Sequence, residues 1–499
     1  MNDGFQALRS HALQYAPALA REAFARGLLT TAPDGSRKPI PPGATPVVLP
    51  ARVIAERHAL ARTLATAGFR MAQAIVAGPS RELLLSALSP LERRVVELAS
   101  PGMRRLAIAR IDFLVNRTPA ALELNATIPA MPGYSDMAAG AFLDAVGRVA
   151  GLDAEAVQTL ARENGSNVEA LHRALLTATI EERGRPPRRI ALLCRRGDSQ
   201  LSEVDHLVRR FGELGTETHR VHPDEAGGAG AFVAHGLTFD LVYRHLFVHR
   251  LSETPHPFLE AFFAGQAGRD TLLLNGPAPH IEAKSNFALL SRAADEPALA
   301  TAAGLGPEEL AAIRRAVPWT RMLAGGPARL PDGAEVPDLL AHVAAHPEAF
   351  VLKRAWDYGG KAVFVGPAAA EPGFASRSGS AFGSALPWPE LVARAAEDRR
   401  GGGFVVQAVV EAPRATHLLA TETGAVESEV YVDYSGFASV GLDEEPEWGG
   451  VVRASASRIV NIQGGGGVLP LLRESVWNRL RSALEAESGA SPRVQDAGH

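Results

Sequence analysis

Two short polar motifs lie close together in the chain and contain the residue types that hold a metal ion. Arg110 and Asp112 form an Arg-x-Asp motif, and Glu123 and Asn125 form a Glu-x-Asn motif. Side chains two residues apart on a strand share a face. If the two segments pair as a hairpin, two carboxylates and an amide oxygen converge, and such hard oxygen ligands suit Mg²⁺. A surface hairpin with a solvated polar face explains the same spacing equally well.

A second group has residue types that bind phosphate. Lys353 ends the apolar run Phe350–Lys353, and Gly359, Gly360 and Lys361 precede a second apolar run. Glycines let backbone N–H groups approach phosphate oxygens because no Cβ stands in the way. The segment is not a Walker A loop, since no Gly-Lys-Ser/Thr opens a helix. An ordinary hairpin is the alternative interpretation.

Two further cations lie beside a helix start and a glycine run. Lys284 follows Asn275-Gly276-Pro277 at the predicted start of a helix, within reach of an α- or β-phosphate. Arg453 lies in a predicted strand that precedes Asn461 and the run Gly464–Gly467. An arginine beside a glycine loop suits the charge that develops on a transferring phosphoryl group. The alternatives are an ordinary surface lysine and a flexible loop.

The use of lysine supports these assignments. Among 51 Lys and Arg residues, lysine occurs only at positions 38, 284, 353 and 361. Lysine is a compact point charge on a flexible stem, whereas arginine is a wide planar fork, so the two are not interchangeable at a phosphate. Three of the four lysines fall in the segments that have phosphate-binding character.

Composition excludes several classes of protein. The formal net charge of -4 argues against a dedicated nucleic-acid binder, and one Cys excludes a disulfide framework or a Cys-rich metal site. No apolar run approaches the ~20 residues of a membrane span. The N-terminus, Met1–Phe5, lacks the basic and apolar segments of a signal peptide. We therefore expect a cytoplasmic enzyme or binding protein with no nucleic-acid or membrane partner.

The elements that must position these residues follow from the hydrophobic pattern. The strands Leu106–Phe113 and Ala121–Asn125 are predicted to form the hairpin that holds the first two motifs. A charged, Pro-containing linker, Glu181–Pro187, then leads into a small doubly wound βαβ unit. The segment Gly366–Pro387 is rich in Gly, Ala, Ser and Pro, which favours a mobile segment. The predicted regions are helices (1–100), hairpin and helices (101–187), βαβ unit (188–280), α+β lobes (281–486) and a disordered tail (487–499).

The motifs and their order resemble a known family. Arg110-x-Asp112, Glu123-x-Asn125 and the following Pro129–Ser135 segment resemble the metal-binding end of ATP-grasp ligases. In D-alanine–D-alanine ligases a similar Glu-x-Asn leads into a Pro-Gly segment near the end of the catalytic domain. Here it precedes the βαβ unit and the phosphate-region lysines, an order that is similar to circularly permuted ATP-grasp proteins such as glutathionylspermidine synthases.

The resemblance implies a fold and an activity. The fold is an α+β and α/β, circularly permuted ATP-grasp with a pre-ATP-grasp-like unit at 188–280 and nucleotide-binding lobes at 281–486. The activity is ATP- and Mg²⁺-dependent ligation of a small-molecule carboxylate to an amine, through an acylphosphate, to give an amide or peptide bond. The implied metal ligands are Asp112, Glu123 and Asn125.

The same resemblance assigns the remaining residues. Lys284 and Lys353 would hold phosphates, and Gln407 and the residues up to Val410 would meet the adenine. Gly359, Gly360, Lys361 and Asn461 would complete the nucleotide site. Arg110 and Arg453 would offset charge on the γ-phosphoryl group and the acyl oxygen, and Arg244 would pair with a substrate carboxylate.

The sequence departs from the family pattern in places and leaves alternatives open. Arg354 follows Lys353 where many ATP-grasp proteins have Pro, the glycine turn lacks a third Gly, and residues 1–100 match nothing in the family. A non-catalytic nucleotide-binding scaffold and a small-molecule kinase are the other functions considered. The N-terminal helices either cap the active site or form a contact in a homodimer. The sequence identifies neither the acid nor the amine.

Overall fold

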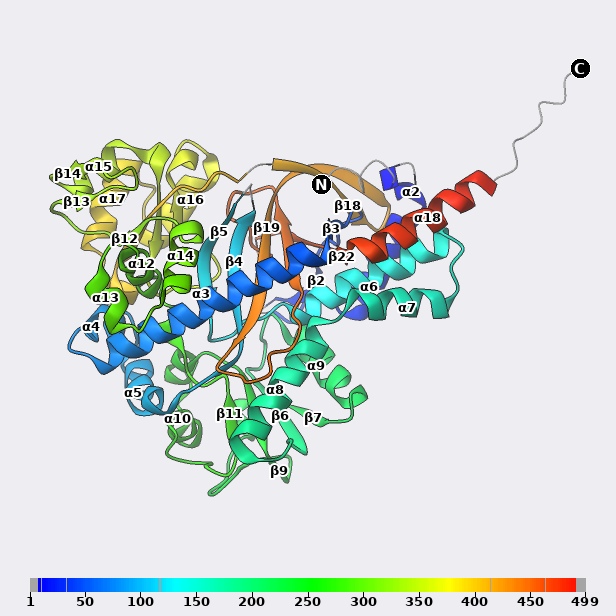
Figure 1. Ribbon diagram of the computed structural model, residues 1–499, viewed down its shortest axis with the longest axis horizontal. Helices are drawn as coiled ribbons and strands as arrows, with labels where there is room; N and C mark the ends of the chain where they lie inside the picture. Colours follow the sequence, from blue (N-terminus) through cyan, green and yellow to red (C-terminus); the bar gives the residue numbers. More distant parts are fainter. Residues whose placement is uncertain are drawn as a thin grey trace, which may run out of the picture.

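The computed structural model describes residues 8–9, 11–32, 34–115, 118–412, 414–462 and 464–490. Three sheets dominate it (Figure 1). The central sheet has the strand order β21-β20-β19-β4-β5, and β18 pairs with β19. Its strands are β4 (Leu106–Val115), β5 (Pro119–Asn125), β18 (Arg414–Thr421), β19 (Gly424–Val440), β20 (Gly450–Ser455) and β21 (Gly467–Leu469).

The central sheet is covered by helices because successive residues of its strands alternate between its faces. Ile111 and Phe113 of β4 are fully buried against α3 (Ala51–Ala77), which crosses the front of the sheet in Figure 1. The other face packs on α2 (Ala12–Arg26), α6 (Pro132–Val149) and α8 (Asn167–Arg183). Arg110 and Asp112 occupy the alternate positions of β4 and therefore point away from α3.

The second sheet is parallel and belongs to the predicted βαβ unit. Its order is β11-β10-β6-β7, and every pairing in it is parallel. Helix α9 (Leu201–Glu213) connects β6 to β7. The strands are β6 (Arg189–Cys194), β7 (Glu217–Val221), β10 (Leu241–His245) and β11 (Leu272–Leu274).

The third sheet is antiparallel, with the order β12-β17-β15-β16. It packs on α15 (Leu339–Ala345), α16 (Pro372–Phe382) and α17 (Trp388–Glu397) around a separate hydrophobic core. Its strands are β12 (Thr320–Met322), β15 (Phe350–Arg354), β16 (Val363–Val365) and β17 (Phe404–Ala408). Helix α12 (Lys284–Ala293) leads from the parallel sheet towards this lobe.

Several local predictions need correction. The segment Gly366–Pro387, expected to be mobile, contains α16, because Phe374 packs into the core of the third sheet. After α3, the predicted helical region 1–100 continues as two helices, α4 (Glu82–Leu85) and α5 (Pro90–Ala99), since Ser89 caps a new helix that starts at Pro90. The structure also adds three short strands between α2 and α3, namely β1 (Leu29–Thr31), β2 (Arg37–Pro39) and β3 (Val47–Leu49).

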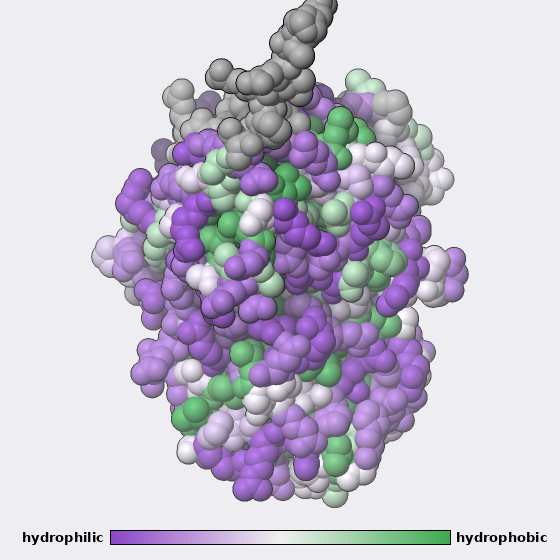
Figure 2. All heavy atoms as spheres, turned by 90° about the vertical axis from the view of Figure 1, so that its right-hand side faces the viewer, coloured by the Kyte–Doolittle hydropathy of each residue, from purple (hydrophilic) through white to green (hydrophobic). Residues whose placement is uncertain are grey.

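The C-terminal helix and the outer surface complete the fold. Helix α18 (Glu474–Ala490) packs on α6. It includes residues 487–490, which the sequence assigned to a disordered tail, and residues 491–499 of that tail lie outside the described residues. The face that carries α18 is mainly hydrophilic, with apolar side chains in small patches between polar ones (Figure 2). Within the described ranges, no helix has the length and apolar character needed to cross a membrane.

Asn275 joins the parallel sheet to the central sheet. Its Oδ1 accepts a hydrogen bond from Ala107 N (2.9 Å), and its Nδ2 donates to the carbonyls of Ile108 (2.6 Å) and Ala126 (3.0 Å). The side chain is fully buried. It therefore satisfies backbone groups at β4 and just after β5 from the loop that follows β11.

We expect Asn275→Ala to lower the free energy of unfolding by about 3 kcal/mol, because it leaves buried backbone groups without partners. Chemical denaturation followed by circular dichroism measures the change. The exposed Asn478 on α18 provides the control Asn478→Ala, for which we expect little change. Equal stability of the two variants would contradict a joining role for Asn275.

Candidate active site

One large cavity of about 330 Å³ lies where the three sheets meet. The central sheet contributes Arg110 and Glu123, the parallel unit contributes Arg195, and the third sheet contributes Lys353 and Gln407. Every predicted site residue except Arg244 lines this cavity. The structure thus brings together segments that are separated by more than three hundred residues in the sequence.

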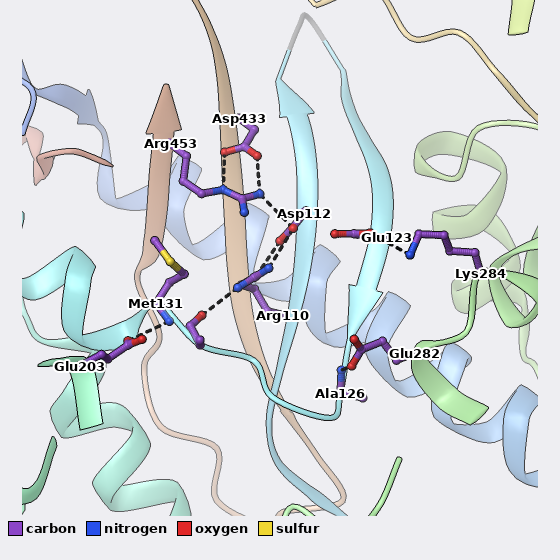
Figure 3. A network of polar contacts seen from close by, with 11 residues as sticks. Arg110, Asp112, Glu123, Ala126, Met131, Glu203, Glu282, Lys284, Asp433 and Arg453 are labelled. Atoms are coloured by element: carbon purple, nitrogen blue, oxygen red, sulfur yellow. Dashed lines mark hydrogen bonds and ion pairs between the residues drawn. The ribbon is translucent and has the colours of Figure 1, made fainter. Parts of the chain in front are cut away.

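The β4–β5 hairpin places Arg110, Asp112 and Glu123 on one face of the central sheet (Figure 3). The two strands pair antiparallel, with Asp112 opposite Glu123 and Arg110 opposite Asn125. The register is therefore the one that the two motifs require. Asp112 is 2% exposed and Arg110 is 7% exposed, so both charges need partners within the protein.

Those partners are each other and an ion pair on the neighbouring strands. Arg110 donates to both oxygens of Asp112, from Nε (2.7 Å) and Nη2 (3.1 Å), and Arg453 of β20 donates to Asp112 Oδ2 (3.0 Å). Arg453 also forms a two-point ion pair with Asp433 of β19, which is its direct cross-strand partner. Two guanidinium groups and two carboxylates thus form one buried cluster across three adjacent strands (Figure 3).

The cluster shifts the acidity of its members in opposite directions. Burial by itself raises the pKa of Asp112, but the charges of Arg110 and Arg453 outweigh it and hold that pKa well below its usual range. Burial raises the pKa of Asp433 to about 6, although Arg453 opposes the shift. The two carboxylates raise the pKa of Arg453 despite its burial.

This arrangement bears on the predicted metal ligands. Both oxygens of Asp112 already accept hydrogen bonds from arginine, so this carboxylate is committed to the cluster. Glu123 is different: its side chain is 33% exposed and pairs with Lys284 at 3.4 Å. The Nδ2 of Asn125 is buried without a hydrogen-bond partner. Within the described residues, no group of three or more His, Cys, Asp or Glu side chains is arranged to hold a metal by itself.

Two of the four lysines flank Glu123. Lys284, at the start of α12, donates from Nζ to the Asp357 carbonyl (2.9 Å). Lys353, on β15, donates from Nζ to the Leu122 carbonyl (3.1 Å). Both are more than nine-tenths buried, and burial lowers the pKa of Lys353 to about 8. The early acidic hairpin therefore lies beside the glycine turn that follows Lys353.

The glycine turn closes one side of the cavity. Gly359 and Gly360 both have positive φ angles, near 70°, and a Cβ on Gly360 would lie 2.9 Å from Ile459 Cγ2. Glycine is thus required here for both backbone conformation and space. The Gly359 carbonyl accepts a hydrogen bond from Asn461 Nδ2 (2.7 Å), and the Lys361 ammonium lies 4.6 Å from the centre of the Tyr358 ring.

An apolar slot continues the cavity at the third sheet. Val351 and Val365, on paired strands, and Val409, just after β17, line it. Gln407 also lines the cavity, although its Nε2 donates to Thr320 Oγ1 (3.0 Å) and its side chain is 2% exposed. The slot has the character of a surface that accepts a flat, largely apolar group.

The structure places Arg244 away from the cavity. Its guanidinium is 1% exposed and donates to the carbonyls of Asn275 (3.3 Å), Thr127 (3.1 Å) and Gly276 (3.2 Å), and also to Leu246. An arginine that satisfies this many backbone carbonyls has a structural role, and its placement does not favour the predicted contact with a substrate carboxylate. Burial lowers its pKa to about 10.

Sequence reasoning missed two acidic residues of the site. Asp433 lies on β19 directly opposite Arg453 of β20, and nothing in its local sequence indicates this cross-strand pairing. Glu282 lies two residues before Lys284, and its Oε2 accepts hydrogen bonds from Ala126 N (3.0 Å) and Thr127 N (2.7 Å). It thereby fixes the chain just after Asn125, and nothing in its local sequence indicates that role.

Comparisons with known proteins address the fold. No family model matches the sequence, and no curated protein matches it. A glutathione synthetase-like effector from Globodera pallida, solved in its apo form, superposes with a TM-score of 0.58 at 10% identity, covering 93% of this chain and 97% of that one. A protein from Methylobacillus flagellatus, named as a candidate gamma-glutamylcysteine synthetase, gives a TM-score of 0.37 at 13% identity over 89% and 97% of the two chains.

The first of these similarities extends over nearly the whole length of both chains. The chain therefore has a mixed α/β fold like that of a glutathione synthetase-like protein, and the predicted mixed fold class is confirmed at this level. At such low identity the similarity concerns the fold alone.

We expect Arg453→Met to destabilise the protein by about 3–5 kcal/mol at pH 8, because it leaves buried carboxylates without their guanidinium partner. The pKa of Asp433 then rises further, so the folded variant binds more protons than the unfolded chain. The loss of unfolding free energy in the variant, relative to wild type, therefore becomes smaller as pH falls from 8 to 5. Thermal unfolding over this pH range measures the effect.

The control is Arg394→Met on α17, whose side chain is 62% exposed. It should change stability little, and by the same amount at each pH. A deficit of Arg453→Met that stayed constant between pH 8 and pH 5 would contradict the electrostatic account of the cluster.

Proposed function

We propose that this protein is an ATP- and Mg²⁺-dependent carboxylate–amine ligase. The observation that carries the proposal is the convergence of Lys284 and Lys353 on Glu123, at the meeting point of three sheets and beside the Arg110–Arg453 cluster. Two buried ammonium groups around one carboxylate leave an excess of positive charge next to a neutral cluster. Such a site is suited to a polyanion that carries a divalent cation with it.

The nucleotide is proposed to lie along the third sheet. Its base would occupy the apolar slot beside Gln407 and Val409, and its phosphates would extend towards Lys353 and Lys284. The backbone of Gly359 and Gly360 would cover the phosphates, because no side chain blocks their approach. Release of Lys284 from the Asp357 carbonyl would free its ammonium for a phosphate oxygen.

The residues present fit Mg²⁺ at one side of this site. Glu123 offers a partly exposed carboxylate, and Asn125 has an amide Nδ2 without a hydrogen-bond partner. Since the assignment of amide O and N is interchangeable, Asn125 can present its oxygen to a cation. Asp112 accepts hydrogen bonds from Arg110 and Arg453, and it would therefore orient these two arginines. When bound, Mg²⁺ would neutralise phosphate charge and orient the phosphates.

The proposed chemistry has two steps. In the first, a substrate carboxylate oxygen attacks the γ-phosphorus; a new O–P bond forms, the bond to the β–γ bridging oxygen breaks, and ADP leaves. In the second, the neutral amine attacks the acyl carbon, the bond to the phosphate oxygen breaks, and the amine proton passes to the departing phosphate or to solvent. The protein's contribution is positioning and charge stabilisation, with Arg110 and Arg453 facing the transferring group.

The order of the segments fits a circular permutation. The Glu123–Asn125 hairpin precedes both lysines in the sequence but lies beside them in space. The fold similarity to a glutathione synthetase-like protein supports a ligase assignment for the class of reaction. We place the acid and the amine at the end of the cavity that the parallel unit borders, where Arg195 and Gln200 provide polar groups.

Product analysis separates the proposed function from its competitors. The protein is incubated with Mg²⁺, ATP and a panel of carboxylates and amines, and ADP, phosphate and organic products are followed by mass spectrometry. We expect stoichiometric ADP, phosphate and amide for at least one pair. A stable phosphorylated acid without amide would indicate a kinase, and nucleotide binding without turnover would indicate a scaffold; either result overturns the proposal.

Substitution of Lys353 tests its proposed role in binding phosphate. We expect Lys353→Met to lower turnover by about 10²–10³-fold, because a buried charge that faces the transferring phosphoryl group is lost. Lys38→Met removes the exposed lysine on β2 and should leave turnover unchanged. Steady-state ADP release measures both, and similar activity of the two variants would refute the phosphate-binding assignment of Lys353.

The role of Glu123 is tested through the metal. We expect chelation of Mg²⁺ to abolish activity and Glu123→Gln to raise the Mg²⁺ concentration for half-maximal turnover about tenfold or more, since the carboxylate charge is lost. Glu422→Gln, at an exposed position of the β18–β19 turn, is the control. A Mg²⁺ requirement that is the same in both variants would exclude Glu123 as a metal ligand.

A further inference from the structure

A buried glutamate outside the cavity contacts the main chain next to Arg110. Glu203 lies in the first turn of α9, in the parallel unit, and is 1% exposed. Its Oε1 accepts hydrogen bonds from the backbone N–H groups of Met131 (2.8 Å) and Gly133 (2.9 Å). Figure 3 shows it on the opposite side of this segment from the arginine cluster. Neither the sequence motifs nor the proposed chemistry uses this residue.

The Ala130–Met131 peptide links Glu203 to Arg110. The N–H of this peptide donates to Glu203, and its carbonyl accepts a hydrogen bond from Arg110 Nη1 (2.9 Å). A trans peptide is planar, so its N–H and C=O point in opposite directions. Holding the N–H end in place therefore fixes the direction of the carbonyl at the other end. Glu203 and Arg110 are bonded to the two ends of one rigid group.

Glu203 stabilises an unusual backbone conformation at Met131. Met131 has φ of 98°, in the left-handed region that residues with a side chain rarely adopt. Gly133 is close to Glu203, because a Cβ there would lie 3.0 Å from Glu203 Cγ. An unfavourable conformation at Met131 is maintained because two N–H groups meet one carboxylate oxygen.

We infer that Glu203 is a positioning residue for Arg110, and that it couples the parallel unit to the phosphoryl end of the cavity. The inference rests on the proposed function for the role of Arg110, but not for the contact itself. Arg110 receives its orientation from Asp112 on one side and from the Ala130 carbonyl on the other. Removal of Glu203 frees the peptide to rotate and leaves Arg110 held from one side only.

The surroundings of Glu203 make its charge sensitive to pH. Burial raises its pKa to about 7, while the N–H groups of Gly133 and Met131 and the charge of Arg110 oppose the shift. The titratable groups that face it are Arg110 on β4, Tyr134 on α6, Tyr243 on β10 and His206 on its own helix. The charged carboxylate binds the two N–H groups more strongly than the protonated acid does. The hydrogen bond that fixes the Ala130–Met131 peptide therefore weakens as pH falls below neutrality.

The first test compares nucleotides that differ in the γ-phosphate. With Mg²⁺ at pH 8, we expect Glu203→Ala to weaken binding of the non-hydrolysable ATP analogue AMP-PNP about tenfold and Glu203→Gln to weaken it by a smaller factor, with the ADP affinity of both variants within about twofold of wild type. Calorimetry measures both. Glu203→Gln mimics the protonated acid, so its AMP-PNP affinity should differ less from that of wild type at pH 6 than at pH 8. The control is Glu213→Gln, at the exposed end of the same helix.

The second test does not depend on nucleotide binding. Crystal structures of wild type, Glu203→Gln and Glu203→Ala should show the Ala130–Met131 peptide rotated and Arg110 released from the Ala130 carbonyl in the alanine variant, with the wild-type arrangement largely kept in the glutamine variant. An unchanged peptide and an unchanged Arg110 in Glu203→Ala would overturn the inference. If wild type binds no nucleotide, the proposed function fails, and the structures alone decide the role of Glu203.

Discussion

The buried cluster of Arg110, Asp112, Arg453 and Asp433 is the interaction on which the rest of the site depends. Charges taken out of water are costly unless they are paired and hydrogen-bonded, and here each carboxylate faces at least one guanidinium. The four side chains come from three adjacent strands, β4, β19 and β20. Their mutual attraction therefore favours one register of these three strands, and β5 pairs with β4 so that Glu123 and Asn125 line the cavity beside the cluster.

The charge balance beside the cluster supports the proposed anionic ligand. The cluster is neutral in total, so it does not offset the positive charges of Lys284 and Lys353, and Glu123 offsets only one of them. Burial lowers the pKa of Lys353, which shows that its charged form gains from a nearby anion. The proposed triphosphate with its divalent cation would supply such an anion. In the proposed complex, glycine at 359 and 360 would let the backbone approach the ligand, because no side chain would stand between them.

The sequence predicted those parts of the site that depend on neighbours along the chain. Alternation along β4 and β5 predicted that Arg110 and Asp112 share a face, as do Glu123 and Asn125, and the structure adds the register that sets Asp112 opposite Glu123. It did not identify Glu203, because that residue acts across two sheets through the main chain of Met131 and Gly133. It also did not identify the structural role of Arg244, since an arginine at a strand end looks the same whether it meets a ligand or backbone carbonyls.

The sequence by itself determined which side chains carry charge, which glycines free the backbone, and how residues alternate on each strand, because these properties are local. Only the tertiary structure decided that Asp112 is shared between two arginines, that Asp433 completes the cluster, and that the early hairpin meets Lys353. The contact of Arg453 with Asp112 and that of Lys353 with the Leu122 carbonyl join residues 341 and 231 positions apart, and their geometry depends on how the strands and sheets pack. Burial, which sets the pKa values and the energetic cost of each unpaired charge, is likewise a property of the packed chain and not of any segment of it.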